Sequence, residues 1–136
     1  MKLQVTPTPG LRILCGFAAA IMVVQVLLLP EADFAVKIVT LTWDKAVHFM
    51  YYGTIAFLLW IAGGRRGPLW VWVAVMAIGA TDEILQIWKP GRTADINDWI
   101  ADSLGSGIAL VIATRFTHAA PADAAPPAQA ATQTGD

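Results

Sequence analysis

The chain has 136 residues, of which 57% are hydrophobic and 14% charged, and its formal net charge is −1. A soluble domain this small has a large surface for its volume and needs more polar residues to cover it, so the excess apolar residues are expected to face lipid. The nine Lys and Arg residues are dispersed, which excludes a basic face for nucleic acid. The single cysteine, Cys15, excludes an internal disulfide.

The first apolar run covers residues 13–29, with basic residues before it and acidic residues after it. It is longer than the usual apolar core of a secretory signal peptide, and only weak cleavage patterns follow it. It therefore predicts an uncleaved membrane anchor. Residues 30–43 alternate charged and apolar residues over too short a stretch to span, which predicts an interfacial segment.

Two further apolar runs each predict a membrane-spanning helix. The run at residues 46–62 ends in a Gly/Arg-rich turn that contains Arg65 and Arg66. The next, residues 69–88, follows Pro68, which is tolerated at the first position of a helix. Its 20 residues match a hydrocarbon thickness of about 30 Å at 1.5 Å per residue.

A polar connection at residues 89–97 leads to a fourth predicted helix at about residues 98–116. In this helix Gly105 and Ala109, four residues apart, offer small side chains for close contact with another helix. The sequence therefore predicts an all-α integral membrane bundle of four transmembrane helices, formed by residues 1–118.

The remaining segment, residues 119–136, is rich in Ala, Pro, Gln and Thr and has no apolar periodicity. It cannot bury enough surface to offset its ordering entropy, so we expect a disordered tail.

An even number of spans places both termini on one side of the membrane. The short basic turn at Arg65 and Arg66 predicts that this is the cytoplasmic side. The six tryptophans lie near predicted helix ends, which indicates an aromatic belt.

Three of the predicted helices carry an ionisable residue at a similar depth below the outer membrane surface: His48, Glu83 and Asp102. Such a residue costs a few kcal/mol in the membrane unless it is paired or hydrated, so each is a candidate functional residue. Neighbours at helical spacing extend the cluster on the same faces. The candidate ligand-binding residues are Asp44, Lys45, His48, Tyr52, Glu83, Gln86, Arg92, Asp95, Asp98 and Asp102.

At these residues the chain resembles the VanZ-like family, named for a glycopeptide-antibiotic resistance protein. The matching segments are Asp44-Lys45-x-x-His48-Phe49-x-x-Tyr52, Thr81-Asp82-Glu83-Ile84-Leu85-Gln86, Pro90-Gly91-Arg92-Thr93-Ala94-Asp95-x-x-Asp98 and Asp98-x-x-x-Asp102-x-x-Gly105. They occur in the family's order over about residues 40–112. Family members usually carry Asn where this chain has Asp102, which adds a carboxyl group here. The resemblance implies a protein of the bacterial cytoplasmic membrane with a link to the cell envelope, and it implies no particular reaction.

Three functions follow from the polar cluster. The first is binding of the headgroup of a lipid or lipid-linked envelope precursor, with Lys45 and Arg92 holding phosphate or carboxylate and the acids taking hydroxyl or ammonium groups. The second is an enzyme acting on such a lipid, with Glu83 or Asp98 and His48 as general acid and base. The third is a structural or transport subunit, in which Glu83 pairs with Arg92 or Lys45 to fix the helix ends.

No cofactor and no metal are predicted. Glu83 and His48, together with Asp95, Asp98 and Asp102, offer ligands for a hard divalent cation, but no tight metal-ligand signature such as His-Glu-x-x-His is present. Asp98 has an alternative role as the N-cap of the fourth helix. Four short helices leave little room for a closed pocket, so a homo-oligomer is a further possible arrangement.

Overall fold

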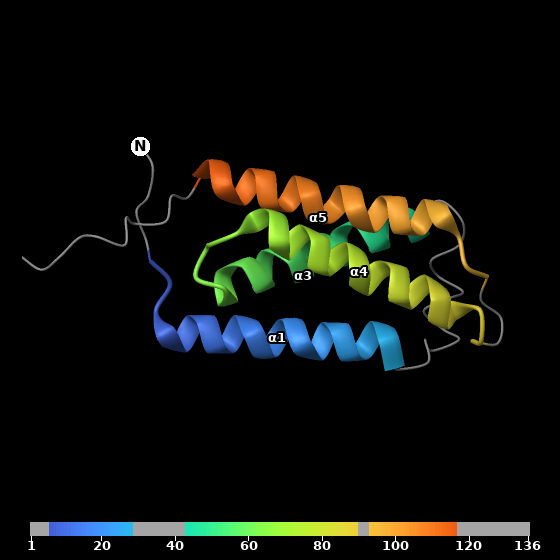
Figure 1. Ribbon diagram of the computed structural model, residues 1–136, viewed down its shortest axis with the longest axis horizontal. Helices are drawn as coiled ribbons and strands as arrows, with labels where there is room; N and C mark the ends of the chain where they lie inside the picture. Colours follow the sequence, from blue (N-terminus) through green and yellow to red (C-terminus); the bar gives the residue numbers. More distant parts are fainter. Residues whose placement is uncertain (1–5, 29–42, 90–92, 117–136) are drawn as a thin grey trace, which may run out of the picture.

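The computed structural model describes residues 6–28, 43–89 and 93–116, which form four helices and no strand. These are α1 (Pro9–Leu28), α3 (Asp44–Ala62), α4 (Pro68–Gln86) and α5 (Ile96–Phe116). They lie side by side, with successive helices running in opposite directions (Figure 1). Three of them, α1, α3 and α4, are long and apolar enough to cross a membrane. The all-α prediction is therefore confirmed for the described residues.

The helix ends agree with the sequence prediction to within a few residues, with one instructive difference. Pro68 occupies the first turn of α4, after Gly67 in a left-handed conformation with φ of 60°. α5 begins before Asp98, because Asp95 Oδ1 accepts a hydrogen bond from the Asn97 N–H at 2.9 Å. The prediction that Asp98 is the N-cap of this helix was thus wrong, and the N-cap is Asp95. The predicted disordered tail and all but the last residue of the predicted interfacial segment lie outside the described residues.

Both α3 and α4 contact the other three helices, and α3 makes the more extensive contacts, above all with α5. Its contact with α5 is the closest, because two glycines face each other there. A Cβ atom at Gly53 would lie 3.1 Å from the carbonyl oxygen of Gly105, and a Cβ at Gly105 would overlap the Phe49 backbone. The predicted small-residue contact of the fourth helix is therefore present, and its partner is α3.

The first helix lies on the opposite side of the bundle from α5, against α3 and α4 (Figure 1). Only Cys15 and Ala19 of α1 are buried. Its other large side chains point outward, and Leu14 and Phe17 are 66% and 67% exposed. An apolar helix with so much exposed surface is stable only in lipid or against another protein.

Hydrogen bonds attach α1 to its neighbours near both of its ends. At one end Arg12 Nε donates to the Ala62 carbonyl oxygen at 3.0 Å. At the other end Lys89 Nζ donates to the Val26 carbonyl oxygen at 3.0 Å. These bonds hold α1 in register with α3 and α4 although it buries few side chains.

The six tryptophans do not form the aromatic belt that their positions near helix ends predicted. Trp60 is 2% exposed and belongs to the core. Trp72 and Trp99 lie partly buried between α4 and α5, where their indole N–H groups donate to the carbonyl oxygens of Ser103 and Met76 at 2.9 and 3.0 Å. The remaining three are 70–75% exposed at helix ends, as a belt requires: Trp43, Trp70 and Trp88.

Candidate functional site

Polar side chains gather at the end of the bundle where α3 and α5 begin and α4 ends, on the right in Figure 1. A polar side chain buried among apolar helices needs a hydrogen-bond partner, so such a concentration is unusual. The structure thus brings together the residues that the sequence placed at one depth. The buried members are His48, Asp82, Glu83, Gln86, Asp98, Asp102 and Ser106.

Lys45, in the first turn of α3, joins this helix to the start of α5. Its Nζ donates to Asp95 Oδ2 at 2.8 Å and to Asp98 Oδ1 at 2.6 Å. The hydrogen bond from Lys45, assisted by the Asn97 N–H, lowers the pKa of Asp95 from 3.8 to about 2. Because Lys45 binds these two aspartates, the expected pair with Glu83 does not form.

His48 and Asp102 form a buried pair between α3 and α5. His48 Nδ1 lies 2.9 Å from Asp102 Oδ1, and the two side chains are 8% and 1% exposed. The imidazole also stacks on Tyr52 at a centroid distance of 6.1 Å. The second oxygen of Asp102 lies close to Gly79, where an added Cβ would come within 2.9 Å of it. A carboxylate in this position fixes the orientation and tautomer of the ring, which suits the histidine for proton transfer or metal binding.

Asp82, which was not among the predicted site residues, organises a second group of polar side chains. Its carboxylate accepts hydrogen bonds from Gln86 Nε2 at 3.1 Å and from Tyr52 OH and Lys89 Nζ at 3.4 Å each. Asp82 is only 2% exposed. Its spacing of four from Gln86 was the available signal, because such residues share a helix face.

Glu83 receives its hydrogen bond from the backbone. Glu83 Oε2 accepts from the Asp95 N–H at 2.8 Å. Its other oxygen, Oε1, is buried and has no hydrogen-bond partner among the described residues. Arg92, the other partner expected for Glu83, lies outside the part of the chain that the structure describes.

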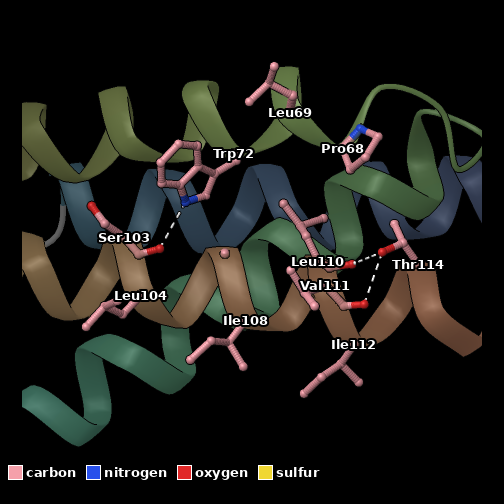
Figure 2. A pocket seen from close by; sticks show the side chains of 11 residues that line it. Pro68, Leu69, Trp72, Ser103, Leu104, Ile108, Leu110, Val111, Ile112 and Thr114 are labelled. Atoms are coloured by element: carbon pink, nitrogen blue, oxygen red, sulfur yellow. Dashed lines mark hydrogen bonds between the residues drawn. The ribbon is translucent and has the colours of Figure 1, made fainter.

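Two hollows differ in size and chemistry. A small cavity of about 140 Å³ between α1 and α3 is lined by His48, Tyr51 and Tyr52, with Gln25 among its other lining residues. A larger groove of about 510 Å³ lies between α4 and α5 and is almost entirely apolar. Figure 2 shows this groove, with the Trp72 indole donating across it to Ser103. His48 and the two tyrosines therefore border the small cavity and not the apolar groove, and the buried acids of the cluster do not line either hollow.

Three helices that are long and apolar enough to cross a membrane indicate a small membrane protein, with a carboxylate-rich cluster at one end of its bundle. The chain belongs to the VanZ/LLP1 family, whose sequence profile matches residues 10–117. The match extends the resemblance of the polar motifs to α1 and so covers all four helices. No curated protein and no solved structure matches the chain significantly.

Proposed function

We propose that this protein binds the polar headgroup of a lipid or a lipid-linked cell-envelope precursor at the acidic end of its helix bundle. The observation that carries the proposal is an excess of carboxylates over cations among the described residues at this end. The two cations are Lys45 and Lys89, and the six carboxylates are Asp44, Asp82, Glu83, Asp95, Asp98 and Asp102. Such a site favours a headgroup that presents ammonium or hydroxyl groups.

Two buried acceptors of the cluster also favour a ligand that donates hydrogen bonds. Glu83 Oε1 and Asp102 Oδ2 have no hydrogen-bond partner among the described residues. A buried acceptor without a partner costs about 1–3 kcal/mol. Neither residue lines the small cavity, so a hydroxyl or ammonium group of the ligand would recover part of this free energy only where the helix ends open to admit it. Lys45 keeps one N–H for a phosphate or carboxylate, after its bonds to Asp95 and Asp98.

The size of the cavity limits how much of the headgroup enters. At about 140 Å³ it is well below the roughly 300–1,000 Å³ of pockets that enclose a whole small molecule. It fits one ammonium or hydroxymethyl group beside His48 and Tyr51, while the rest of the headgroup stays at the membrane surface. The exposed tryptophans at this end, Trp43 and Trp88, would then lie at headgroup depth.

The proposal includes four spans in the bacterial cytoplasmic membrane with both termini inside. α5 lies along the bundle beside α3 and α4 and exposes Leu104, Ile108 and Val111, which suits contact with lipid. The α3–α4 turn carries Arg65 and Arg66, and positive charge in a short loop favours the cytoplasmic side. A membrane-impermeant thiol reagent on intact cells should label Trp43→Cys and not Arg66→Cys, in a Cys15→Ala background. The opposite pattern would overturn this orientation.

The structure also favours a second candidate, a purely structural network. Asp82 has three hydrogen-bond donors, and Lys45 links two carboxylates across α3 and α5. In this alternative the cluster fixes the helix ends and binds nothing. The third candidate, acid–base catalysis on the same lipid, would use the His48–Asp102 pair, with Glu83 or Asp98 as the second acid.

Lipid retention separates these candidates. The full chain is purified in mild detergent as wild type, Glu83→Gln and Thr81→Val, and native mass spectrometry identifies the lipids bound to each. Thr81 is the matched control because it lies on the same helix and is exposed, and among the described residues its hydroxyl bonds only to the Ala77 carbonyl oxygen. We expect one class of envelope lipid on the wild type and on Thr81→Val, and its loss from Glu83→Gln.

Two results would contradict the proposal. If Glu83→Gln folds and retains the same lipids as the wild type, Glu83 does not belong to a headgroup site. If Glu83→Gln fails to accumulate and the wild type retains no specific lipid, the cluster is structural. Should the lipid be confirmed, its turnover by the wild type and by His48→Gln would test catalysis.

A further inference from the structure

Three metal-ligating side chains lie close together at the edge of the polar cluster. One carboxylate oxygen each from Asp44 and Asp98 and one ring nitrogen of His48 all lie within 4.8 Å of one another. Ligand atoms about 2.0–2.2 Å from a shared ion are roughly 3–4 Å apart. Side-chain movements of about 1 Å would therefore bring the three ligand atoms to the distances that a shared ion requires.

The backbone holds these three residues near one another. Asp44 and His48 are four residues apart on α3 and so share a helix face. Asp98 lies in the first turn of α5. The close approach of the two helices at Gly53 and Gly105 fixes the distance between them. Only side-chain torsions have to change when an ion binds.

A carboxylate already holds the imidazole of His48 through one of its nitrogens. His48 Nδ1 bonds to Asp102 Oδ1 at 2.9 Å, and both side chains are more than nine-tenths buried. When Nδ1 carries the proton that this bond requires, Nε2 keeps its lone pair for a metal. Metal-bound histidines almost always bond through their other nitrogen to a carboxylate or carbonyl, which orients the ring and raises its basicity. The His48–Asp102 hydrogen bond is an observation separate from the closeness of Asp44, His48 and Asp98.

We propose that Asp44, His48 and Asp98 bind one divalent metal ion, with Asp102 as the positioning residue behind His48. One imidazole and two carboxylates suit Zn²⁺ or Mn²⁺ better than Mg²⁺ or Ca²⁺, which prefer oxygen ligands alone. Lys45 bonds to Asp98 Oδ1 at 2.6 Å, so the metal would take the other oxygen of Asp98. Three protein ligands leave at least one coordination position for water.

The metal site shares Asp44, His48 and Asp98 with the proposed headgroup site, so its test contains no lipid and measures metal binding alone. The full chain is purified in detergent, stripped with a chelator and titrated with Zn²⁺ and Mn²⁺, with Mg²⁺ as the comparison ion. Bound metal is measured by elemental analysis and affinity by calorimetry. We expect one equivalent of Zn²⁺ or Mn²⁺ on the wild type, and at least about tenfold weaker binding for Asp44→Asn and for Asp102→Asn.

The matched control is Asp95→Asn, which removes a neighbouring carboxylate outside the proposed ligand set. Asp95 and Asp98 both pair with Lys45, so this variant alters the charge of the cluster in the same way as a ligand variant. We expect its Zn²⁺ affinity to change by less than about threefold. Asp44 is only partly buried, so Asp44→Asn should fold and remain a valid test.

Two results would overturn the proposal. In the first, the stripped wild type takes up no Zn²⁺ or Mn²⁺ beyond what Asp44→Asn takes up. In the second, Asp95→Asn weakens binding as much as Asp44→Asn does, which would show diffuse attraction to a negative surface. Lipid retention measured in excess chelator tests the headgroup proposal separately, so that each can fail without the other.

Discussion

Replacing Gly105 with alanine tests the closest contact in the bundle. The added Cβ would lie 2.7 Å from the Phe49 carbonyl carbon and 2.8 Å from its Cα. The Cβ would also overlap the Phe49 carbonyl oxygen. Because carbon atoms pack at about 3.5 Å, α3 and α5 would have to separate locally by more than about 0.8 Å. Such overpacking typically costs about 1–3 kcal/mol, and the higher helix propensity of alanine offsets at most about 1 kcal/mol of it. The same displacement would stretch the 2.9 Å His48–Asp102 contact beyond hydrogen-bond distance.

Thermal unfolding in detergent, followed by intrinsic tryptophan fluorescence, measures this effect. Gly16→Ala is the control, because its Cβ would lie an ordinary 3.7 Å from the Ala62 Cβ. We expect Gly105→Ala to unfold at a clearly lower temperature than the wild type, and Gly16→Ala to unfold at the same or a higher temperature. If the two variants behave alike, the α3–α5 contact is looser than these distances require.

Three further perturbations use the same assay. Asp82→Ala should lower the free energy of unfolding by about 2–3 kcal/mol, because it leaves buried donors without their acceptor, whereas Asp95→Ala should have a much smaller effect. Asp95 has a pKa lowered to about 2 in the folded protein, so its bond to Lys45 stabilises the fold above about pH 4. The free energy of unfolding that this bond contributes should be lost as the pH falls from about 4 to 2. In Asp95→Asn the unfolding temperature should lack this pH-dependent part. Gly79→Ala should destabilise the protein, because its Cβ displaces the Asp102 carboxylate; an unchanged unfolding temperature would contradict this.

The helices and the depth of the polar residues could be predicted because both depend on position along the chain. Apolar length fixes where a helix enters and leaves the membrane, and helices of similar length that alternate in direction bring residues near matching ends to one level. His48, Glu83 and Asp102 therefore lie at one end of the bundle, as their positions along the sequence indicated.

The partners of these residues could not be predicted, because they depend on how each helix is rotated about its axis. A helix with lipid on one side and apolar neighbours on the other has little polar contrast between its faces, so the sequence carries a weak signal for rotation. This is why the burial of Trp60 and the three partners of Asp82 were missed. It is also why the sequence offered Lys45 only as one of two alternative partners of Glu83, beside Arg92, and did not predict its bonds to Asp95 and Asp98.

The hydrogen bonds near the two ends of α1 bear on how the protein responds to bilayer thickness. Arg12 and Val26 are 14 residues apart, or about 21 Å along the helix axis. Because one is bonded to the end of α3 and the other to the Lys89 side chain after α4, α1 cannot slide along its neighbours without breaking a bond. A thinner or thicker bilayer must therefore be matched by tilting the whole bundle or by deforming the lipid around it. Membrane thickness would then act on α1, α3 and α4 as one unit.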